Sequence, residues 1–229
     1  MIANYHTHTW RCNHAHGVEK QYIEKAIRQG LQILGFSDHT PYCFPNGYIE
    51  IHLGLEAEYY PEIWEGLLKL IEPYPIEYLL LGQHYIHNEY EGDRYNGKPG
   101  HSDADLLLYC SQCKEALETG RFLYFAHPDL INHSGDPALY EQEMRKLCRF
   151  CKEKEIPLEI NLLGVRQDRS YPNELFWRIA AQEGNSVIYG SDAHWPEHVL
   201  SPEVVRKADD FIARCGIPRQ RLLMTMPLE

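Results

Sequence analysis

Short apolar segments alternate along this chain with longer amphipathic segments. The apolar segments have the length and composition of buried β-strands. Seven strands are predicted in this way, over residues 2–6, 31–37, 51–57, 78–82, 122–126, 157–161 and 186–190.

Apolar residues in the intervening segments recur every three or four positions, as on one face of an α-helix. Val18, Tyr22, Ile23 and Ala26 form such a face, and Gly30 could end that helix. Further helices are predicted over residues 61–71, 101–117, 140–151, 172–183 and 204–212. The alternation of seven strands with these helices predicts a parallel α/β sheet covered by helices. Because there is no glycine-rich dinucleotide fingerprint, we expect a closed TIM-like barrel rather than an open doubly wound sheet.

The size and charge of the chain limit its class. Its 229 residues fit a single domain, residues 1–229. No apolar run approaches the roughly 20 residues that span a bilayer, and the amino terminus does not resemble a signal peptide, so we expect a cytoplasmic protein. The formal net charge of −11 disfavours a nucleic-acid partner, although bound divalent cations would still allow an anionic small-molecule substrate. Nothing in the sequence indicates an oligomeric state.

Seven cysteines are present, and this odd number excludes complete pairing within the chain. Two Cys-x-x-Cys pairs, Cys110/Cys113 and Cys148/Cys151, suggest either a four-cysteine zinc site or a redox motif. Each pair lies in a predicted helix, however, and the interval between the pairs exceeds the usual spacing of such zinc sites. We therefore predict buried, reduced thiols, with metal binding and redox activity as the alternatives.

Polar residues that can bind metals or form hydrogen bonds follow all seven predicted strands. The strand ends read His6-Thr7-His8, Ser37-Asp38-His39, Leu55-Glu56-Ala57-Glu58, Gly82-Gln83-His84, Ala126-His127-Pro128, Glu159-Ile160-Asn161 and Ser191-Asp192-Ala193-His194, and His14 follows the first strand closely. Parallel barrels gather their active sites at the carboxyl ends of the strands, so these side chains should converge. In His-x-His along a strand, both imidazoles point to the same side and can bind one ion.

Nine of these residues are candidate metal ligands: His6, His8, His14, His39, Glu56, His84, His127, Asp192 and His194. Neutral imidazoles with a few carboxylates suit zinc, manganese or iron, and the lack of thiolates argues against a purely structural zinc site. Glu56 could bridge two cations and offset part of their mutual repulsion. The sequence therefore predicts a site for two or three divalent metal ions.

The ordered motifs from His6-Thr7-His8 to Ser191-Asp192-Ala193-His194 resemble those of the polymerase and histidinol phosphatase (PHP) family. The segment from Glu159 to Arg166 is most similar to the histidinol-phosphate phosphatase branch. The resemblance implies a distorted (β/α)7 barrel with a trinuclear metal centre. By position, the first metal would be held by His6, His8, Glu56 and Asp192, the second by Glu56, His84 and His127, and the third by His14, His39 and His194.

The resemblance also implies a metal-dependent phosphomonoesterase that converts histidinol phosphate to histidinol in histidine biosynthesis. A hydroxide bridging two metals would attack phosphorus in line with the leaving alcohol. Arg166 is the first candidate to bind the phosphoryl oxygens, because a guanidinium matches phosphate in a bidentate way. Weaker candidates for contact with the substrate are Arg169, Arg11 and His133. Asp192 or His194 would transfer the proton of the leaving group.

Other functions fit parts of the same pattern. An amidohydrolase also begins with His-x-His on a barrel strand, but it often bridges its metals through a carboxylated lysine, and no lysine ends a predicted strand here. Other PHP phosphoesterases, acting on nucleotides, nucleic acids or phosphotyrosine, would share the same ligands. A metal-binding module without catalysis would be expected to have lost a ligand, yet all nine positions are filled.

Overall fold

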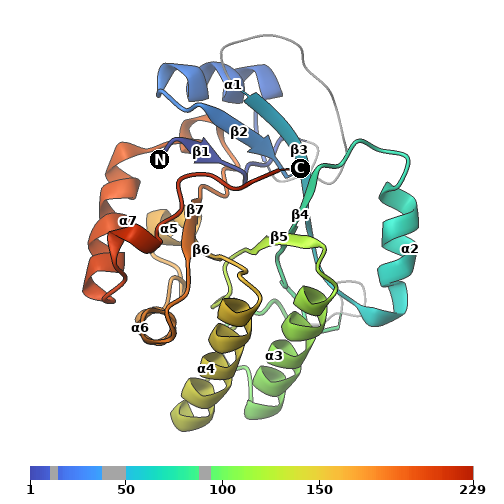
Figure 1. Ribbon diagram of the computed structural model, residues 1–229, viewed down its shortest axis with the longest axis vertical. Helices are drawn as coiled ribbons and strands as arrows, with labels where there is room; N and C mark the ends of the chain where they lie inside the picture. Colours follow the sequence, from blue (N-terminus) through green and yellow to red (C-terminus); the bar gives the residue numbers. More distant parts are fainter. Residues whose placement is uncertain (11–14, 38–49, 88–93, 229) are drawn as a thin grey trace.

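A computed structural model describes residues 1–10, 15–37, 50–87 and 94–228. Its seven strands form one parallel sheet in which strand order follows chain order (Figure 1). The strands are β1 (Ala3–Asn4), β2 (Ile33–Phe36), β3 (Glu50–Ala57), β4 (Tyr78–Leu81), β5 (Phe122–Phe125), β6 (Leu158–Asn161) and β7 (Val187–Gly190). A parallel bridge between Thr7 and Ala193 joins the two edges of the sheet, so the barrel is nearly closed. The predicted barrel of seven strands is therefore confirmed.

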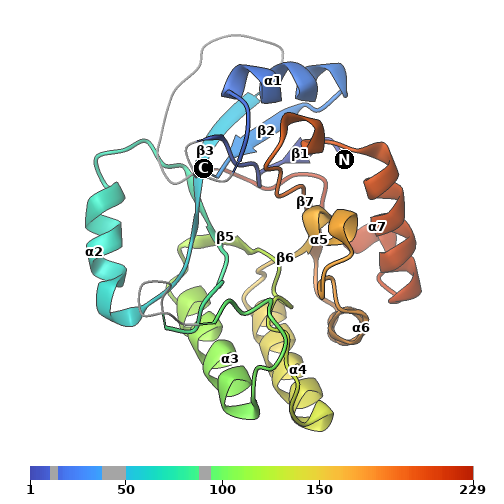
Figure 2. The same cartoon turned by 180° about the vertical axis from the view of Figure 1, so that it is seen from behind.

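Helices surround the outside of the sheet (Figures 1 and 2). They are α1 (Glu19–Arg28), α2 (Pro61–Ile71), α3 (Asp103–Glu118), α4 (Pro137–Glu153), α5 (Leu162–Gln167), α6 (Glu174–Glu183) and α7 (Pro202–Arg214), with 3-10 helices η3 (Pro196–His198) and η4 (Arg219–Arg221). The repeat is less regular than predicted, because two helices follow β6. Between β2 and β3, residues 38–49 lie outside the described part of the chain.

Side-chain caps determine where the helices that follow the site begin. Ser102 accepts a hydrogen bond from the Asp105 backbone N–H at the start of α3, and Asp105 accepts one from Ser102 in return. At α6, the side-chain Oδ1 atom of Asn173 accepts from the backbone N–H groups of Leu175 and Phe176. These caps satisfy backbone donors that the first helical turn leaves without partners, so each helix begins at a defined residue.

Alternation along the strands divides the core into two layers. Leu79 and Leu81 of β4 point outward and pack under the helices, together with most of the large apolar residues. Tyr78 and Leu80 of the same strand point into the barrel, where they join Tyr124 and other residues of an inner cluster. The interior of the barrel is therefore filled with side chains below the level of the strand ends.

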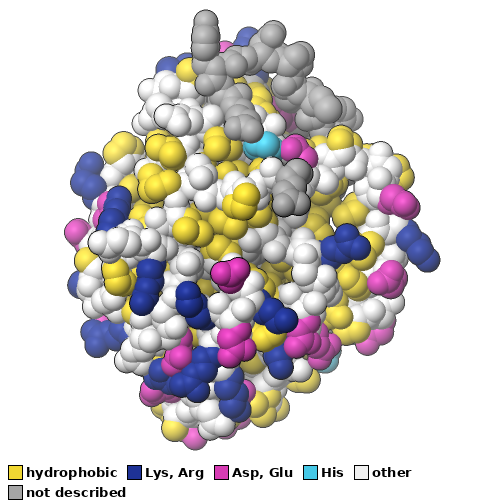
Figure 3. All heavy atoms as spheres, in the orientation of Figure 1, with side chains coloured by type: hydrophobic (Ala, Val, Ile, Leu, Met, Phe, Trp, Pro, Cys, Tyr) yellow, Lys and Arg dark blue, Asp and Glu magenta, His cyan; other side chains and the backbone are white. Residues whose placement is uncertain are grey.

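The C-terminal segment closes the amino end of the barrel. Leu222 forms a parallel bridge with Val187, the first residue of β7, and Met226 exchanges hydrogen bonds with the Tyr5 hydroxyl. Met226 and Leu228 pack against the inner cluster. In Figure 1 this segment runs across the end of the barrel, and apolar side chains gather at the centre of the same face in Figure 3.

The four cysteines of the two Cys-x-x-Cys motifs lie in α3 and α4, as predicted. Cys110, Cys113, Cys148 and Cys151 are all buried, free thiols in the layer between these helices and the sheet. Burial raises the pKa of Cys110 and of Cys151 to about 12, so these thiols stay protonated at neutral pH. The prediction of buried helical thiols is confirmed.

No helix in the described parts of the chain is long and apolar enough to cross a bilayer. The cytoplasmic location remains a prediction.

Candidate metal centre

The predicted ligands that the structure describes meet at the carboxyl ends of the strands. His6 and His8 follow β1, Glu56 lies near the end of β3, and His84 and His127 follow β4 and β5. Asp192 and His194 follow β7. His14, His39 and Arg11 lie outside the described residues.

The first group of donors consists of His6, His8 and Asp192, whose donor atoms lie within 4.8 Å of one another. The two Nε2 atoms of the histidines are 3.1 Å apart. The Asp192 Oδ1 atom lies 3.7 Å from Nε2 of His6 and 3.5 Å from Nε2 of His8. All three residues are buried. The His-x-His geometry expected from strand alternation therefore brings both rings to one point.

The second group consists of Glu56, His84 and His127, again within 4.8 Å of one another. The Glu56 Oε1 atom lies 2.8 Å from Nε2 of His127 and 3.7 Å from Nε2 of His84. Its other oxygen, Oε2, lies 3.3 Å from Nε2 of His6, in the first group. Glu56 thus faces both groups with one oxygen each, which is the arrangement of a bridging carboxylate.

A second carboxylate, Glu159, forms hydrogen bonds with one histidine of each group, away from the Nε2 atoms that could bind a metal. Its Oε1 atom lies 2.7 Å from Nδ1 of His6, and its Oε2 atom accepts the backbone N–H of His127 at 3.0 Å. The side chain of Asn161 donates to Glu159 at 3.1 Å and to Asp192 Oδ2 at 3.0 Å. A carboxylate on Nδ1 keeps the proton there and leaves Nε2 free to bind a metal.

Glu58 has the corresponding place behind His84. Its Oε1 atom lies 3.5 Å from Nδ1 of His84 and accepts the backbone N–H groups of His84 and Tyr85. Glu58, which directly follows β3, therefore holds the turn after β4 in place.

Two glycines make room for these carboxylates. A Cβ atom at Gly82 would overlap the carboxylate of Glu56, and one at Gly190 would overlap that of Glu159. Gly82 directly follows β4 and Gly190 ends β7, and each of these strands pairs with the strand that carries the carboxylate. Only a residue without a side chain fits at either position while the carboxylate keeps its place.

The backbone is strained at two of the candidate ligands. His127 has φ of 30° and Asp192 has φ of 45°, values that residues with a Cβ atom rarely adopt. Such conformations cost on the order of 1–3 kcal/mol each and persist where the surrounding structure imposes them. Their occurrence at the ends of β5 and β7 indicates that side-chain placement, rather than local stability, determines the backbone here.

The charges of the cluster are strongly coupled. Burial alone would lower the pKa of His6, but Glu159, Glu56 and Asp192 raise it well above its usual range. Burial would likewise raise the pKa of Glu56, but the positive charge of His6 and His84 lowers it well below its usual range. Three buried carboxylates thus need positive charge beside them. Divalent cations would supply it in place of the protons, so the donor set fits metal ions in charge as well as in ligand type.

The sequence comparison gives the family. Residues 4–162 match the model of the PHP domain. The chain belongs to the PHP domain family.

Curated relatives of this PHP chain are named as phosphatases. It is 26% identical to a probable histidinol-phosphatase of Deinococcus radiodurans, over 86% of this chain and 88% of the relative. It is 24% identical to a probable phosphatase of Clostridium novyi, over 84% of this chain and 79% of the relative. These names agree with the expected class of enzyme.

A solved structure supports the fold. The histidinol phosphate phosphatase of Lactococcus lactis, complexed with zinc, L-histidinol and phosphate, matches this chain with a TM-score of 0.72 and 17% identity. The match covers 98% of this chain and 96% of the other. At this identity the likeness establishes a shared barrel.

His194 lies at the edge of the PHP cluster. Its ring stacks on that of His8 with centroids 4.5 Å apart, and its Nδ1 atom lies 3.0 Å from the backbone oxygen of Asp192. Its side chain is 18% exposed, against 3% for His8. His194 therefore borders both the cluster and the solvent.

Arg166 lies on α5, a helix that the sequence did not predict. Its Nη2 atom donates to the backbone oxygen of His198 at 3.1 Å, whereas Nη1 is buried without a hydrogen-bond partner among the described residues. Burial lowers the pKa of Arg166, and the negative charge of Asp192 opposes this shift. The guanidinium is thus anchored on one side, close to the cluster, with a buried donor left to bind an anion.

Arg169 and two tyrosines flank the other side of the cluster. The Nη1 atom of Arg169 donates to the Tyr171 hydroxyl at 2.6 Å, and Tyr171 is also hydrogen-bonded with Tyr95. The Tyr171 ring lies 5.8 Å from that of His127, between centroids, and the Tyr95 ring 6.1 Å from that of His84. These aromatic residues form a wall beside the second group, which the sequence analysis did not identify.

His133, the remaining predicted substrate contact, lies elsewhere. Its Nε2 atom is 2.8 Å from Oδ1 of Asp103 at the start of α3, and its ring stacks on Tyr140 of α4. None of its described contacts involves the cluster.

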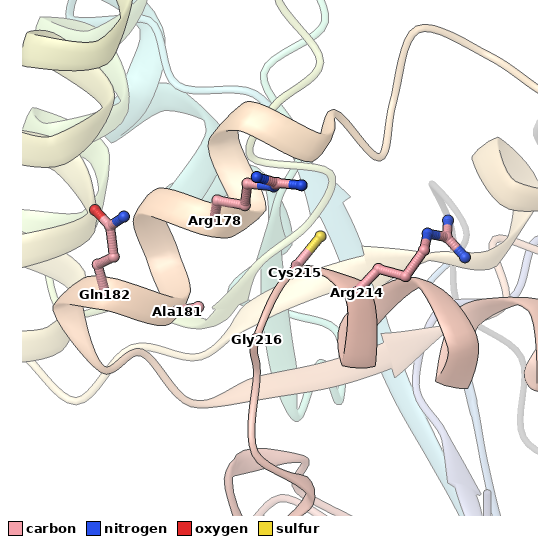
Figure 4. Close-up of a pocket in the computed structure, with 6 residues that line it drawn as sticks. All are labelled: Arg178, Ala181, Gln182, Arg214, Cys215 and Gly216. Carbon is pink, nitrogen blue, oxygen red and sulfur yellow. The ribbon is translucent and has the colours of Figure 1, made fainter.

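A separate hollow with a volume of ≈ 440 Å³ lies between α6 and the end of α7 (Figure 4). It is lined by Arg178, Ala181, Gln182, Arg214, Cys215 and Gly216. Arg178 already pairs with Glu174, one turn earlier in α6. The hollow contains none of the candidate ligands, and no role in the chemistry follows from it.

Proposed function

We propose that this PHP domain is a metal-dependent phosphomonoesterase whose substrate is histidinol phosphate. The observation that carries the proposal is the pair of donor groups joined by Glu56, with the second oxygen of that carboxylate 3.3 Å from Nε2 of His6. Two adjacent metal sites with a shared carboxylate are a recurring arrangement for hydrolysis of phosphate esters.

The ligand assignment follows the two groups. His6, His8, Asp192 and Glu56 would hold one ion, and Glu56, His84 and His127 a second. A third ion, on His14, His39 and His194, belongs to the same proposal. When bound, the ions would lower the pKa of water enough to supply a nucleophile near neutral pH and would neutralise charge on the phosphoryl group.

The remaining side chains would bind the substrate and move protons. Arg166 would bind the phosphoryl oxygens through Nη1, which has no hydrogen-bond partner among the described residues, while the His198 carbonyl holds Nη2. With only the first two ions bound, His194 would be the better candidate to give a proton to the leaving alcohol, because Asp192 is already engaged by Asn161, His6 and His8; with the third ion bound, His194 would serve as its ligand instead. His194 also borders solvent, from which its proton can be replaced.

Histidinol phosphate is favoured over other monoesters for two reasons. A curated relative is named a probable histidinol-phosphatase, and a protein of the same fold was solved with L-histidinol and phosphate. A nucleic-acid substrate is disfavoured by the net charge of −11.

The test is phosphate release from histidinol phosphate compared with sugar, nucleotide and aryl phosphates. The protein is purified without chelator and assayed with added manganese, zinc or iron(II), then again after metal removal. A strong preference for histidinol phosphate that disappears with the metal is expected. Turnover of the other esters but not of histidinol phosphate would refute the substrate and keep the chemistry. No release from any ester by metal-loaded protein would refute both. Elemental analysis of the same samples distinguishes two bound ions from three.

A further inference from the structure

Asp129 is a buried carboxylate that takes no part in either donor group. It follows His127 by two residues and is 3% exposed. Its side chain contacts α6 rather than the cluster. One oxygen, Oδ2, accepts both the backbone N–H of Asn173, at 2.5 Å, and the indole N–H of Trp177, at 3.0 Å.

The surroundings of Asp129 make it an expensive group to bury. Other residues around it, such as Tyr140 and Cys148, offer no positive charge. A buried carboxylate without a cation destabilises a fold unless its hydrogen bonds fix something that the protein requires.

The hydrogen bonds of Asp129 fix the distance between two parts of the site. On one side is the turn after β5, which places His127 in the second donor group. On the other is the start of α6, which follows directly on the segment carrying Arg169 and Tyr171. The Tyr171 ring packs 5.8 Å from the His127 ring, and its hydroxyl accepts from Arg169. The wall beside the second group therefore depends on a link that lies outside the site.

We propose that Asp129 is a positioning residue that holds Tyr171 and Arg169 against the metal centre, and so contributes to substrate binding through them. This inference rests on the proposed phosphomonoesterase function, because the wall matters only if a phosphate ester binds beside it. The described side-chain hydrogen bonds of Asp129 go to Asn173 and Trp177, and none of them goes to a candidate ligand.

Asp129→Asn and Asp129→Ala form the decisive pair. Asparagine can place its amide oxygen where Oδ2 now lies and keep both hydrogen bonds, whereas alanine leaves both donors without a partner. We expect Asp129→Ala to raise KM for histidinol phosphate by about tenfold or more, with unchanged metal content and a smaller change in kcat. Asp129→Asn should remain close to the parent protein.

Two further variants separate positioning from general stability. Asp136→Ala removes the cap of α4, where the Asp136 side chain accepts from Ala138. It should lower Tm without raising KM. Tyr171→Phe keeps the ring beside His127 but loses the bond from Arg169, and adding Asp129→Ala to it should raise KM little further. If Asp129→Ala does not fold, Trp177→Phe removes one of the two donors and should raise KM by a smaller factor.

Binding of inorganic phosphate to the metal-loaded protein gives a readout that does not need turnover. Weaker phosphate binding by Asp129→Ala, restored in Asp129→Asn, would support the positioning role even if histidinol phosphate is not hydrolysed. In that case the proposed function would be refuted and the positioning role of Asp129 would be retained. Unchanged KM and phosphate affinity in Asp129→Ala, or equal defects in the alanine and asparagine variants, would overturn the inference.

Discussion

Glu159→Gln is the substitution that most directly tests the described geometry. The change keeps the size of the side chain and removes one negative charge. If the amide oxygen faces His6, the amide N–H₂ faces two donors, the His127 backbone N–H and the Asn161 side chain. If the amide is reversed, its N–H₂ faces Nδ1 of His6 and moves the proton of that ring to Nε2, the atom that must bind the metal.

Neither orientation preserves both contacts, so we expect a loss of metal affinity of about 10–100-fold, the usual effect of removing a partner behind a metal ligand. In free energy this is about 1.4–2.7 kcal/mol. The affinity is measured by competition with a chromophoric chelator at fixed pH. Glu141→Gln, an exposed change on α4 where the carboxylate pairs only with Arg145 in its described contacts, is the control. An affinity of Glu159→Gln within about twofold of the parent would refute the proposed role.

Three further predictions follow from the same site. Gly82→Ala should displace Glu56 and abolish most metal binding, whereas Gly66→Ala in α2, where a Cβ atom meets nothing within 4 Å, should leave it intact; elemental analysis of both proteins checks this. Arg166→Ala should raise KM for the phosphate ester by about tenfold or more with normal metal content, and an unchanged KM would remove Arg166 from the substrate site. In metal-free protein the pKa of His6 is raised, so its stabilising contribution is complete below about pH 6.5 and is lost as pH rises through the raised value. Tm of the chelated protein should therefore fall with rising pH, while metal affinity, which requires the neutral ring, should increase; a parallel rise of both would contradict this assignment.

The two donor groups could be predicted because each of their members lies where a predicted strand ends. Alternation along a strand places both imidazoles of His6 and His8 on one side, and the parallel barrel brings the strand ends together. The sequence therefore identified every member of the two described groups. The roles of Glu159 and Glu58 could not be predicted, although both residues lie at strand ends. Which histidine each carboxylate contacts depends on the stagger between neighbouring strands, and the sequence of one strand does not determine that stagger.

The substrate side was harder to predict for a different reason. Helix α5 has 6 residues, too few to show a helical period, so the position of Arg166 relative to the cluster could not be derived. Tyr171 is a buried residue in an irregular segment, with no periodic pattern to indicate which way it points. His133 follows β5 in sequence, as the candidate ligands follow their strands. Its side chain nevertheless contacts Asp103 at the start of α3 instead of the cluster.

The closed amino end of the barrel has a practical consequence for attaching this protein to a surface or to a second protein. The C-terminal segment lies at the end opposite the candidate metal centre, so an anchor there would leave the mouth facing outward. Met226 and Leu228, however, pack into the barrel interior, and tension on the chain end would pull them from it. A flexible spacer between these residues and the anchor would absorb the tension, so that Met226 and Leu228 stay packed in the barrel.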